Sequence, residues 1–311
     1  MTEKHIYEIS QLVFKQSPSR IIRQTIGRCN EVFELVFDSE SYILRVHELK
    51  VILYGTHKSL PIFKDLGIRT PEIVAEDYSK SNFPFCYQIL TKLEGKDLGV
   101  VIDSLSPTEL RGIAAEVSNI FDKFKSLPPK EDFGSVFGTR EDSIPNMYEV
   151  VMQKKEGALK NSASSQVLNK DVQRILHELI DTYRDYFHQV QPILYYDDIN
   201  AKNVMIHEGK FSGLVDLDFM MKGDYLEAIG CMMACWYGED YGEIYLSEIF
   251  KQQNLNDLQQ NIVRLYAILN LASWTSEAGV KTNSNTTAEI NWERVRKSNE
   301  RIMSIYASMK K

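Results

Sequence analysis

The sequence predicts an α+β protein of two lobes, in which a small antiparallel β-sheet lobe precedes a larger, mainly helical lobe. Short runs rich in Ile, Val, Phe and Tyr fill the first hundred residues, whereas apolar residues recur at steps of three and four from about residue 106. A chain of 311 residues is also longer than a single small hydrophobic core usually stabilises. We therefore expect lobes at residues 1–93 and 94–311, with a ligand site in the cleft between them.

The first lobe is expected to contain five strands and one helix. The turn sequences at residues 27–30 and 38–40 separate the first three strands, which is typical of an antiparallel meander. A helix is expected over residues 51–64, interrupted by Pro61 because proline has no backbone N–H. The expected strands are residues 20–26, 31–37, 41–47, 73–75 and 85–91.

The second lobe is expected to consist mainly of helices. Ser106 and Glu109 have the spacing of a capping box, and the apolar face that follows ends at Leu127, ahead of two prolines. Polar residues 282–287 are expected to form a mobile loop. The expected helices are residues 107–127, 147–152, 171–190, 225–236, 256–274 and 292–309, and the expected strands are residues 193–196, 204–207 and 213–216.

Composition excludes several classes of function. Lys and Arg total 36 and Asp and Glu total 43, so the net charge of −7 argues against sequence-independent binding of nucleic acid. No apolar run reaches the roughly 18 residues of a membrane span, and the N-terminus lacks a signal-peptide pattern. Four cysteines are too few for a disulfide scaffold, and Cys231 and Cys235 are expected in the core. We expect a cytoplasmic protein without nucleic-acid or membrane partners; its oligomeric state stays open.

Three polar residues stand at the ends of neighbouring short strands. Asp198 and Asn203 occupy the loop before residues 204–207, and Asp216 ends the next predicted strand. Phosphoryl transfer from ATP needs a carboxylate that orients an attacking hydroxyl and takes its proton, together with oxygen ligands for Mg²⁺. If the strands pair, Asp198 is the orienting base, and Asn203 and Asp216 hold Mg²⁺.

These motifs resemble those of the aminoglycoside phosphotransferase and choline kinase family, which are small-molecule kinases with a protein-kinase-like fold. The pattern is Asp198-x4-Asn203 followed by Val215-Asp216-Leu217-Asp218. Further segments resemble the family in the same order, namely residues 25–33, 42–46, 66–71, 93–98 and Gly223-Asp224. The resemblance covers residues near 20 to 240. It implies the fold, ATP and Mg²⁺ as cofactors, and an Asp224 that holds the catalytic loop in place.

The resemblance assigns the nucleotide to the first lobe. Arg45 stands where the family usually has a Lys that reaches the α- and β-phosphates, and Arg is also a good phosphate partner. Gly27 and Asn30 belong to the hairpin that would cover the phosphates, although a plain hairpin turn is a rival interpretation. Backbone groups near Leu90 to Leu93 would hold the adenine.

Several positions depart from the family pattern. Tyr196 replaces a His that mainly supports the catalytic loop. No acidic residue lies between residues 50 and 65, so the helix Glu that pairs with the strand cation is missing. Asp218 stands where Gly or Trp is common, and it either helps to hold a second Mg²⁺ or hydrogen-bonds the loop backbone. Asp197 replaces a Gly and lies either near the metal or, more commonly for such a residue, solvated or capping the loop.

The expected activity is that of an ATP- and Mg²⁺-dependent kinase whose acceptor is a small-molecule hydroxyl compound, such as an aminoglycoside, an amino alcohol or a sugar. Acidic residues such as Glu227 and Glu239 would suit a cationic acceptor, although most such residues are only a solvated face. The alternative is a nucleotide-binding pseudokinase with a regulatory role, favoured by Tyr196 and the missing helix Glu. A protein kinase is disfavoured because only four residues separate Asp218 from Gly223.

Overall fold

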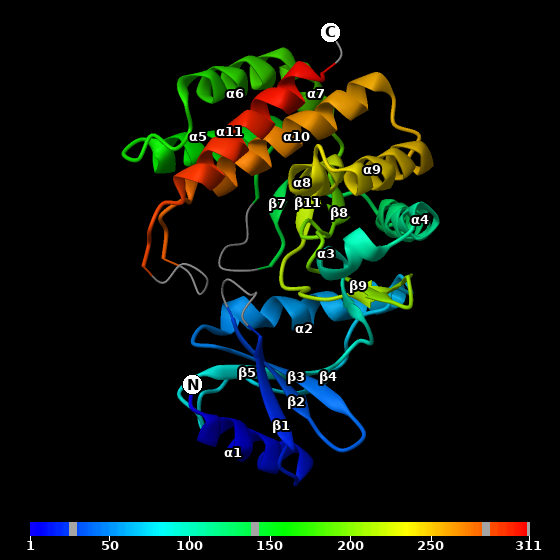
Figure 1. Ribbon diagram of the computed structural model, residues 1–311, viewed down its shortest axis with the longest axis vertical. Coiled ribbons are helices and arrows are strands. Elements are labelled where there is room, and N and C mark those ends of the chain that lie inside the picture. The colour runs from blue at the N-terminus through cyan, green and yellow to red at the C-terminus, as the bar shows by residue number, and fades with distance from the viewer. Residues whose placement is uncertain (25–29, 138–142, 282–286, 310–311) are drawn as a thin grey trace.

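The computed structural model describes residues 1–24, 30–137, 143–281 and 287–309. Figure 1 shows a β-sheet region that contains the N-terminus at one end and a helical region at the other, with helix α2 between them. The predicted α+β class is confirmed. The division at residue 93 stays a prediction. No helix in the described ranges has the length and apolar character needed to cross a membrane.

The first lobe is built on a five-stranded antiparallel sheet in the order β1-β2-β3-β5-β4. All five predicted strands are present, as β1 (Arg20–Gln24), β2 (Glu31–Val36), β3 (Ser41–His47), β4 (Ile73–Asp77) and β5 (Cys86–Thr91). Helix α1 (Glu3–Phe14) was not predicted, although Ile6, Ile9 and Val13 recur in it at steps of three and four. Its Ile6 and Ile9 are buried in one cluster with Leu35 and Leu44 of the sheet.

Helix α2 (Lys50–Asp65) runs through Pro61 without interruption, so the predicted break is wrong. Pro61 and His57, one turn earlier, both lie on the exposed side of the helix. The carbonyl group that the missing Pro61 N–H leaves unbonded therefore faces water, which lowers the cost of the proline. The opposite face of α2 is buried and carries the small residues Gly55, Thr56 and Ser59.

The second lobe is mainly helical, as predicted. Its first long helix begins with the expected capping box, in which the Glu109 amide donates to Ser106 Oγ at 3.3 Å and the Ser106 amide donates to Glu109 Oε2 at 2.8 Å. The predicted helix over residues 171–190 is divided at Tyr183. The α-helices are α3 (Leu98–Val101), α4 (Pro107–Lys125), α5 (Met147–Ser162), α6 (Lys170–Thr182), α7 (Arg184–Gln189), α8 (Leu226–Trp236), α9 (Asp240–Gln252), α10 (Asp257–Ser276) and α11 (Trp292–Ala307).

Helix α9 was not predicted, and α5 is longer than expected because its polar residues obscure the periodicity. The predicted loop at residues 282–287 lies almost wholly outside the described residues. Helix α8 is buried on nearly all sides and packs closely on α10, since a Cβ at Gly230 would lie 2.5 Å from Cβ of Tyr266.

Two small sheets hold the polar loops of the second lobe. One has the order β10-β9-β6 and the other the order β7-β11-β8. Their strands are β6 (Lys96–Asp97), β7 (Gly134–Ser135), β8 (Ile193–Tyr195), β9 (Val204–His207), β10 (Lys210–Leu214) and β11 (Met221–Gly223). Residues 196–203 therefore connect β8 to β9, and residues 215–220 connect β10 to β11. Strand β10 ends two residues earlier than predicted, which places Asp216 in the second connection.

Candidate active site

The loop between β8 and β9 holds Asp198 and Asn203 together. Asn203 Nδ2 donates to Asp198 Oδ2 at 2.7 Å and to the Asp198 carbonyl at 2.8 Å. The Asn200 side chain contacts Asp198 Oδ1, and Lys202 Nζ lies 3.5 Å from Asp198 Oδ2. Burial raises the pKa of Asp198, and the Lys202 ammonium opposes this rise. About a third of the Asp198 side chain stays exposed, so a hydroxyl group can reach it.

Tyr196 joins this loop to the segment after β10. Its buried hydroxyl lies 3.0 Å from the Val215 carbonyl and 3.1 Å from the Asp216 carbonyl, and it accepts from Asn203 Nδ2 at 3.1 Å. The Val215 amide also donates to the Asn203 carbonyl at 3.0 Å. Tyr196 thus supports the loop from a position where the resembling family has His.

Asp216 has a backbone conformation that suits an exposed functional carboxylate. Its φ of 62° lies in the left-handed region, where Asp is one of the few residues tolerated, and its side chain is 41% exposed. Asn203 donates through its nitrogen, which leaves Oδ1 without a hydrogen-bond donor among the described residues. A carboxylate and an amide oxygen are donors that suit Mg²⁺, so both residues fit this ion.

The described ranges contain no group of three or more His, Cys, Asp or Glu side chains suited to a metal. A Mg²⁺ site in a phosphoryl-transfer enzyme commonly uses one or two protein carboxylates, with the remaining ligands from phosphates and water. The pair Asn203 and Asp216 has this character.

Arg45 of β3 in the first lobe contacts the segment that contains Asp216 and Asp218. Arg45 Nη2 lies 3.0 Å from Asp216 Oδ1, and the Arg45 guanidinium also contacts both carboxylate oxygens of Asp218. Asp218 is buried and accepts from the amide and the hydroxyl of Thr56 on α2. Both oxygens of Asp218 are therefore occupied by donors from the first lobe.

The other predicted nucleotide residues are only partly placed. Gly27 lies outside the described residues. Asn30 precedes β2, and its Oδ1 is buried without a hydrogen-bond partner. Leu90 pairs with Ile43 in the sheet, and the pairing ends at Thr91, so the peptide groups that follow are not part of the sheet. Leu93 is buried against Gly213 of β10.

A second polar cluster lies beside the loop of residues 196–203. Glu227 of α8 is buried, forms an ion pair with Lys154 of α5 and accepts from Tyr195 Oη at 2.6 Å. Burial opposes ionisation of Glu227, but the Lys154 ammonium outweighs it and lowers the pKa. Lys154 also donates to Asn270 Oδ1 at 2.9 Å. Glu227 is thus not the solvated acid that its type suggests.

Asp197, beside Asp198, has a buried Oδ1 without a hydrogen-bond partner, so it is neither solvated nor a cap through that atom. Burial, with the negative charges of Glu227 and Asp198, raises its pKa to about 7. Asp224 accepts from Tyr186 Oη at 2.8 Å and Tyr266 Oη at 3.0 Å. Asp224 therefore holds α7 and α10 to the start of α8, whereas the sequence predicted that it would hold the loop of residues 196–203.

Sequence reasoning missed Lys202, Lys154 and Thr56. Lys202 stands four residues after Asp198, a spacing that offers a signal once the loop is suspected. Lys154 and Thr56 lie in helices far from the motifs in the sequence, where a single Lys or Thr carries no signal of its contact.

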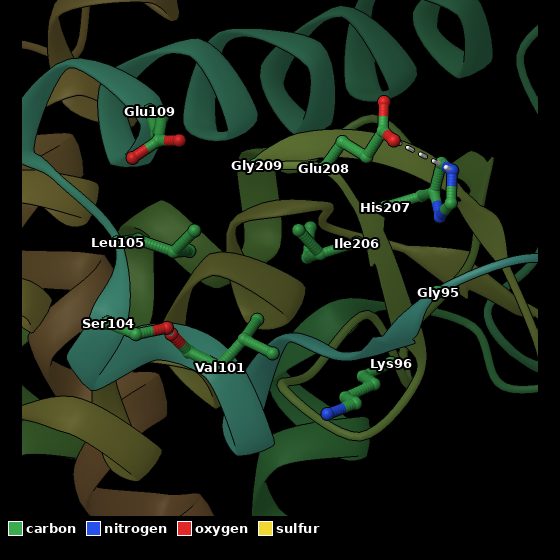
Figure 2. A pocket seen from close by; sticks show the side chains of 10 residues that line it. All are labelled: Gly95, Lys96, Val101, Ser104, Leu105, Glu109, Ile206, His207, Glu208 and Gly209. Carbon is green, nitrogen blue, oxygen red and sulfur yellow. Dashed lines mark hydrogen bonds and ion pairs between the residues drawn. The ribbon is translucent and has the colours of Figure 1, made fainter.

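A pocket of about 370 Å³ lies at the other end of β9, away from these residues. Figure 2 shows Ser104 and Leu105 on one side of it and His207 and Lys96 on the other. None of the predicted site residues lines it. The lining residues are Gly95, Lys96, Val101, Ser104, Leu105, Glu109, Ile206, His207, Glu208 and Gly209.

The chain is similar to known phosphotransferases in sequence pattern and in fold. A family model described as "Phosphotransferase enzyme family" matches residues 23–260. A thermostable mutant of aminoglycoside phosphotransferase APH(4)-Ia in its apo form shares 15% identity with a TM-score of 0.73, over 97% of this chain and 99% of that chain. The streptomycin–ATP ternary complex of APH(2")-IIa shares 12% identity with a TM-score of 0.65, over 98% and 97%. No curated protein sequence matches.

The two structural matches extend over nearly the whole chain and confirm the predicted two-lobed fold. The family match confirms the resemblance inferred from the loops and covers well over half of the 311 residues. The chain therefore belongs to the phosphotransferase enzyme family.

Proposed function

We propose that this protein transfers the γ-phosphoryl group of ATP, with Mg²⁺, to a hydroxyl group of a small molecule. The observation that carries the proposal is that Asn203 bonds Asp198 directly and is linked through Tyr196 to the Asp216 carbonyl, with Arg45 beside Asp216. Structural relatives support the substrate classes, since one was determined with ADP and hygromycin B and another with ATP and streptomycin.

Each residue has a role that its position supports. Asp198, partly exposed, orients the acceptor hydroxyl and takes its proton. Asn203 and Asp216 hold Mg²⁺, which neutralises charge on the phosphates when it is bound. Arg45 faces the phosphates from β3, and backbone groups near Leu90 to Leu93 hold the adenine. The hairpin of residues 25–32, which lies largely outside the described residues, would cover the phosphates. The positive charge of Lys202 opposes the rise that burial causes in the pKa of Asp198.

The acceptor would lie on the exposed side of Asp198. Glu227 is already neutralised by Lys154, so it is not available to a cationic acceptor. Asp197, next to Asp198, has a buried carboxylate oxygen without a hydrogen-bond partner among the described residues. A cationic group of the acceptor would give Asp197 a partner. An acceptor screen should therefore pair aminated hydroxyl compounds, such as aminoglycosides and amino alcohols, with sugars that lack an amine.

The first experiment measures the melting temperature with and without ATP and Mg²⁺ for the wild type and Asp216→Asn. A ligand that binds the folded state must raise it. Asp171→Asn, a change at an exposed carboxylate of α6, is the matched control. We expect a Mg²⁺-dependent rise in the wild type and the control that Asp216→Asn loses, and ADP release that depends on an acceptor. No rise at millimolar ATP would refute the proposal. A rise without turnover on any acceptor would favour the regulatory alternative.

A further inference from the structure

Arg45 is held by the second lobe and not by an acid on α2. Arg45 Nη1 lies 3.2 Å from Asp218 Oδ1, and Nη2 contacts Asp218 Oδ2, so the pair is bidentate. Both side chains are nearly inaccessible, with 5% of Arg45 and 2% of Asp218 exposed. A buried guanidinium without a carboxylate partner would be costly, because little water reaches it. Asp218 therefore supplies the main neutralising charge for Arg45.

Helix α2 carries small residues where it faces this pair. A Cβ at Gly55 would lie 1.9 Å from the Asp218 carbonyl oxygen, so only glycine allows the helix to come this close. Thr56 donates to Asp218 Oδ1 through its hydroxyl at 2.6 Å and through its amide at 3.2 Å. Ser59 Oγ donates to the Leu217 carbonyl at 2.6 Å. The helix thus docks on the backbone of residues 217–218 and orients the Asp218 carboxylate.

Thr56 also touches Arg45 directly, with its Oγ1 3.0 Å from Nη1. Arg45 Nη2 lies 3.0 Å from Asp216 Oδ1, on the more exposed side of the cluster. One edge of the guanidinium is therefore fixed by Thr56 and Asp218, and another faces the carboxylate proposed to hold Mg²⁺.

We propose that Asp218 is a positioning residue that holds Arg45 for the nucleotide phosphates, in place of an acidic residue on α2, with Thr56 orienting its carboxylate. This inference rests on the proposed function. It assigns Asp218 to the strand cation rather than to a second Mg²⁺. Because the cation belongs to β3 and its carboxylate to the segment after β10, the phosphate site forms only when the two lobes are docked.

The test measures the dissociation constant of ADP by titration calorimetry, in EDTA and in Mg²⁺. In EDTA the phosphates rely on Arg45, so Asp218→Asn should weaken ADP binding about tenfold or more, a typical loss for one charge-assisted contact. Asp216→Asn should mainly remove the gain that Mg²⁺ brings. If Asp218 is instead a metal ligand, Asp218→Asn will leave the dissociation constant in EDTA unchanged and reduce only the Mg²⁺-dependent gain, which would overturn the inference.

Two further variants separate positioning from folding. Ser59→Ala removes the hydroxyl that α2 donates to the Leu217 carbonyl but keeps both hydrogen bonds from Thr56 to Asp218, so it should weaken ADP binding in EDTA much less than Asp218→Asn does. Thr56→Asp places a carboxylate beside Arg45 and should restore ADP binding when combined with Asp218→Asn. If Asp218→Asn does not fold, Thr56→Val takes its place, with an expected loss of about threefold or more.

The outcomes for the inference and for the proposed function differ. A wild type that binds ADP neither in EDTA nor in Mg²⁺ refutes the proposed function and the inference with it. A wild type that binds ADP while Asp218→Asn binds equally well in EDTA refutes the inference alone. Equal losses in Ser59→Ala and Asp218→Asn would also refute it, because they would indicate general loosening of α2.

Discussion

The substitution Gly55→Ala, which adds one methyl group, tests how closely α2 packs on the segment after β10. Gly55 lies inside α2, and a Cβ built there would lie 1.9 Å from the Asp218 carbonyl oxygen and 2.6 Å from its carbonyl carbon. Ordinary contacts begin near 3.4 Å, so Gly55→Ala would require α2 or residues 217–218 to move by about 1.5 Å. Both atoms belong to the backbone, so no side-chain rotation relieves the overlap.

Opposing effects decide the size of the change. Replacing Gly by Ala inside a helix normally gains about 1 kcal/mol. Overpacking costs roughly 1–3 kcal/mol, and displacement weakens the two hydrogen bonds from Thr56 to Asp218, each worth about 1 kcal/mol. We expect the overlap to win, with a net loss of about 2 kcal/mol in the free energy of unfolding.

The assay is urea unfolding of the wild type, Gly55→Ala and Gly112→Ala. Gly112 is an exposed glycine of α4, and a Cβ there would meet nothing within 4 Å. The control should gain roughly 0.5–1 kcal/mol, since only helix propensity changes. ADP binding in EDTA should weaken in Gly55→Ala alone, because Asp218 moves with its backbone. If both variants gain stability equally, the close packing of α2 on Asp218 is refuted.

Two other predictions concern buried polar groups next to the site. Tyr196→Phe removes the hydroxyl that joins Asn203 to the carbonyls of residues 215–216, so it should lower the free energy of unfolding by about 1–3 kcal/mol. It should also lower kcat more than it changes the KM for ATP, and an unaltered kcat in steady-state assays would contradict this role. Burial raises the pKa of Asp224 from 3.8 to about 6, so the folded protein favours the protonated carboxyl. This contribution to the free energy of unfolding is fully present below about pH 4 and is lost as the pH rises through about 6. The loss is at most about 3 kcal/mol. Asp224→Asn, which does not ionise, should lack this part of the decline in urea unfolding between pH 4 and 7.5; identical pH profiles for both proteins would count against it.

The sequence was sufficient for features that depend on neighbours along the chain. The five strands of the first lobe follow from runs of β-branched and aromatic residues between turn sequences. Helix α4 follows from its capping box and the apolar period behind it. Asp198 and Asn203 share one loop, so their hydrogen bond is a local consequence of their spacing.

Contacts between distant elements were not predictable in the same way. An acidic residue such as Glu227 is usually found on a solvated helix face, yet here Glu227 is buried and Lys154 of α5 neutralises its charge. Pro61 predicts a break in α2, but the side of the helix on which it falls decides its cost, and that side depends on tertiary packing. The lengths of α5 and α9 depend in the same way on partners from elsewhere in the chain.

Two positions near Arg45 that depart from the family pattern show how contacts between distant elements affect the inferred function. Taken one at a time along the chain, the lack of an acid between residues 50 and 65 and the presence of Asp218 two residues after Asp216 are unrelated, since about 160 residues separate them. In the structure they belong to one contact, in which Arg45 has its carboxylate from Asp218 and α2 contributes Gly55 and Thr56 instead of an acid. A missing helix acid therefore does not leave Arg45 without a charge partner. The regulatory alternative loses one of its two supports, and the other, Tyr196, forms hydrogen bonds that hold the loop of residues 196–203 to residues 215–216.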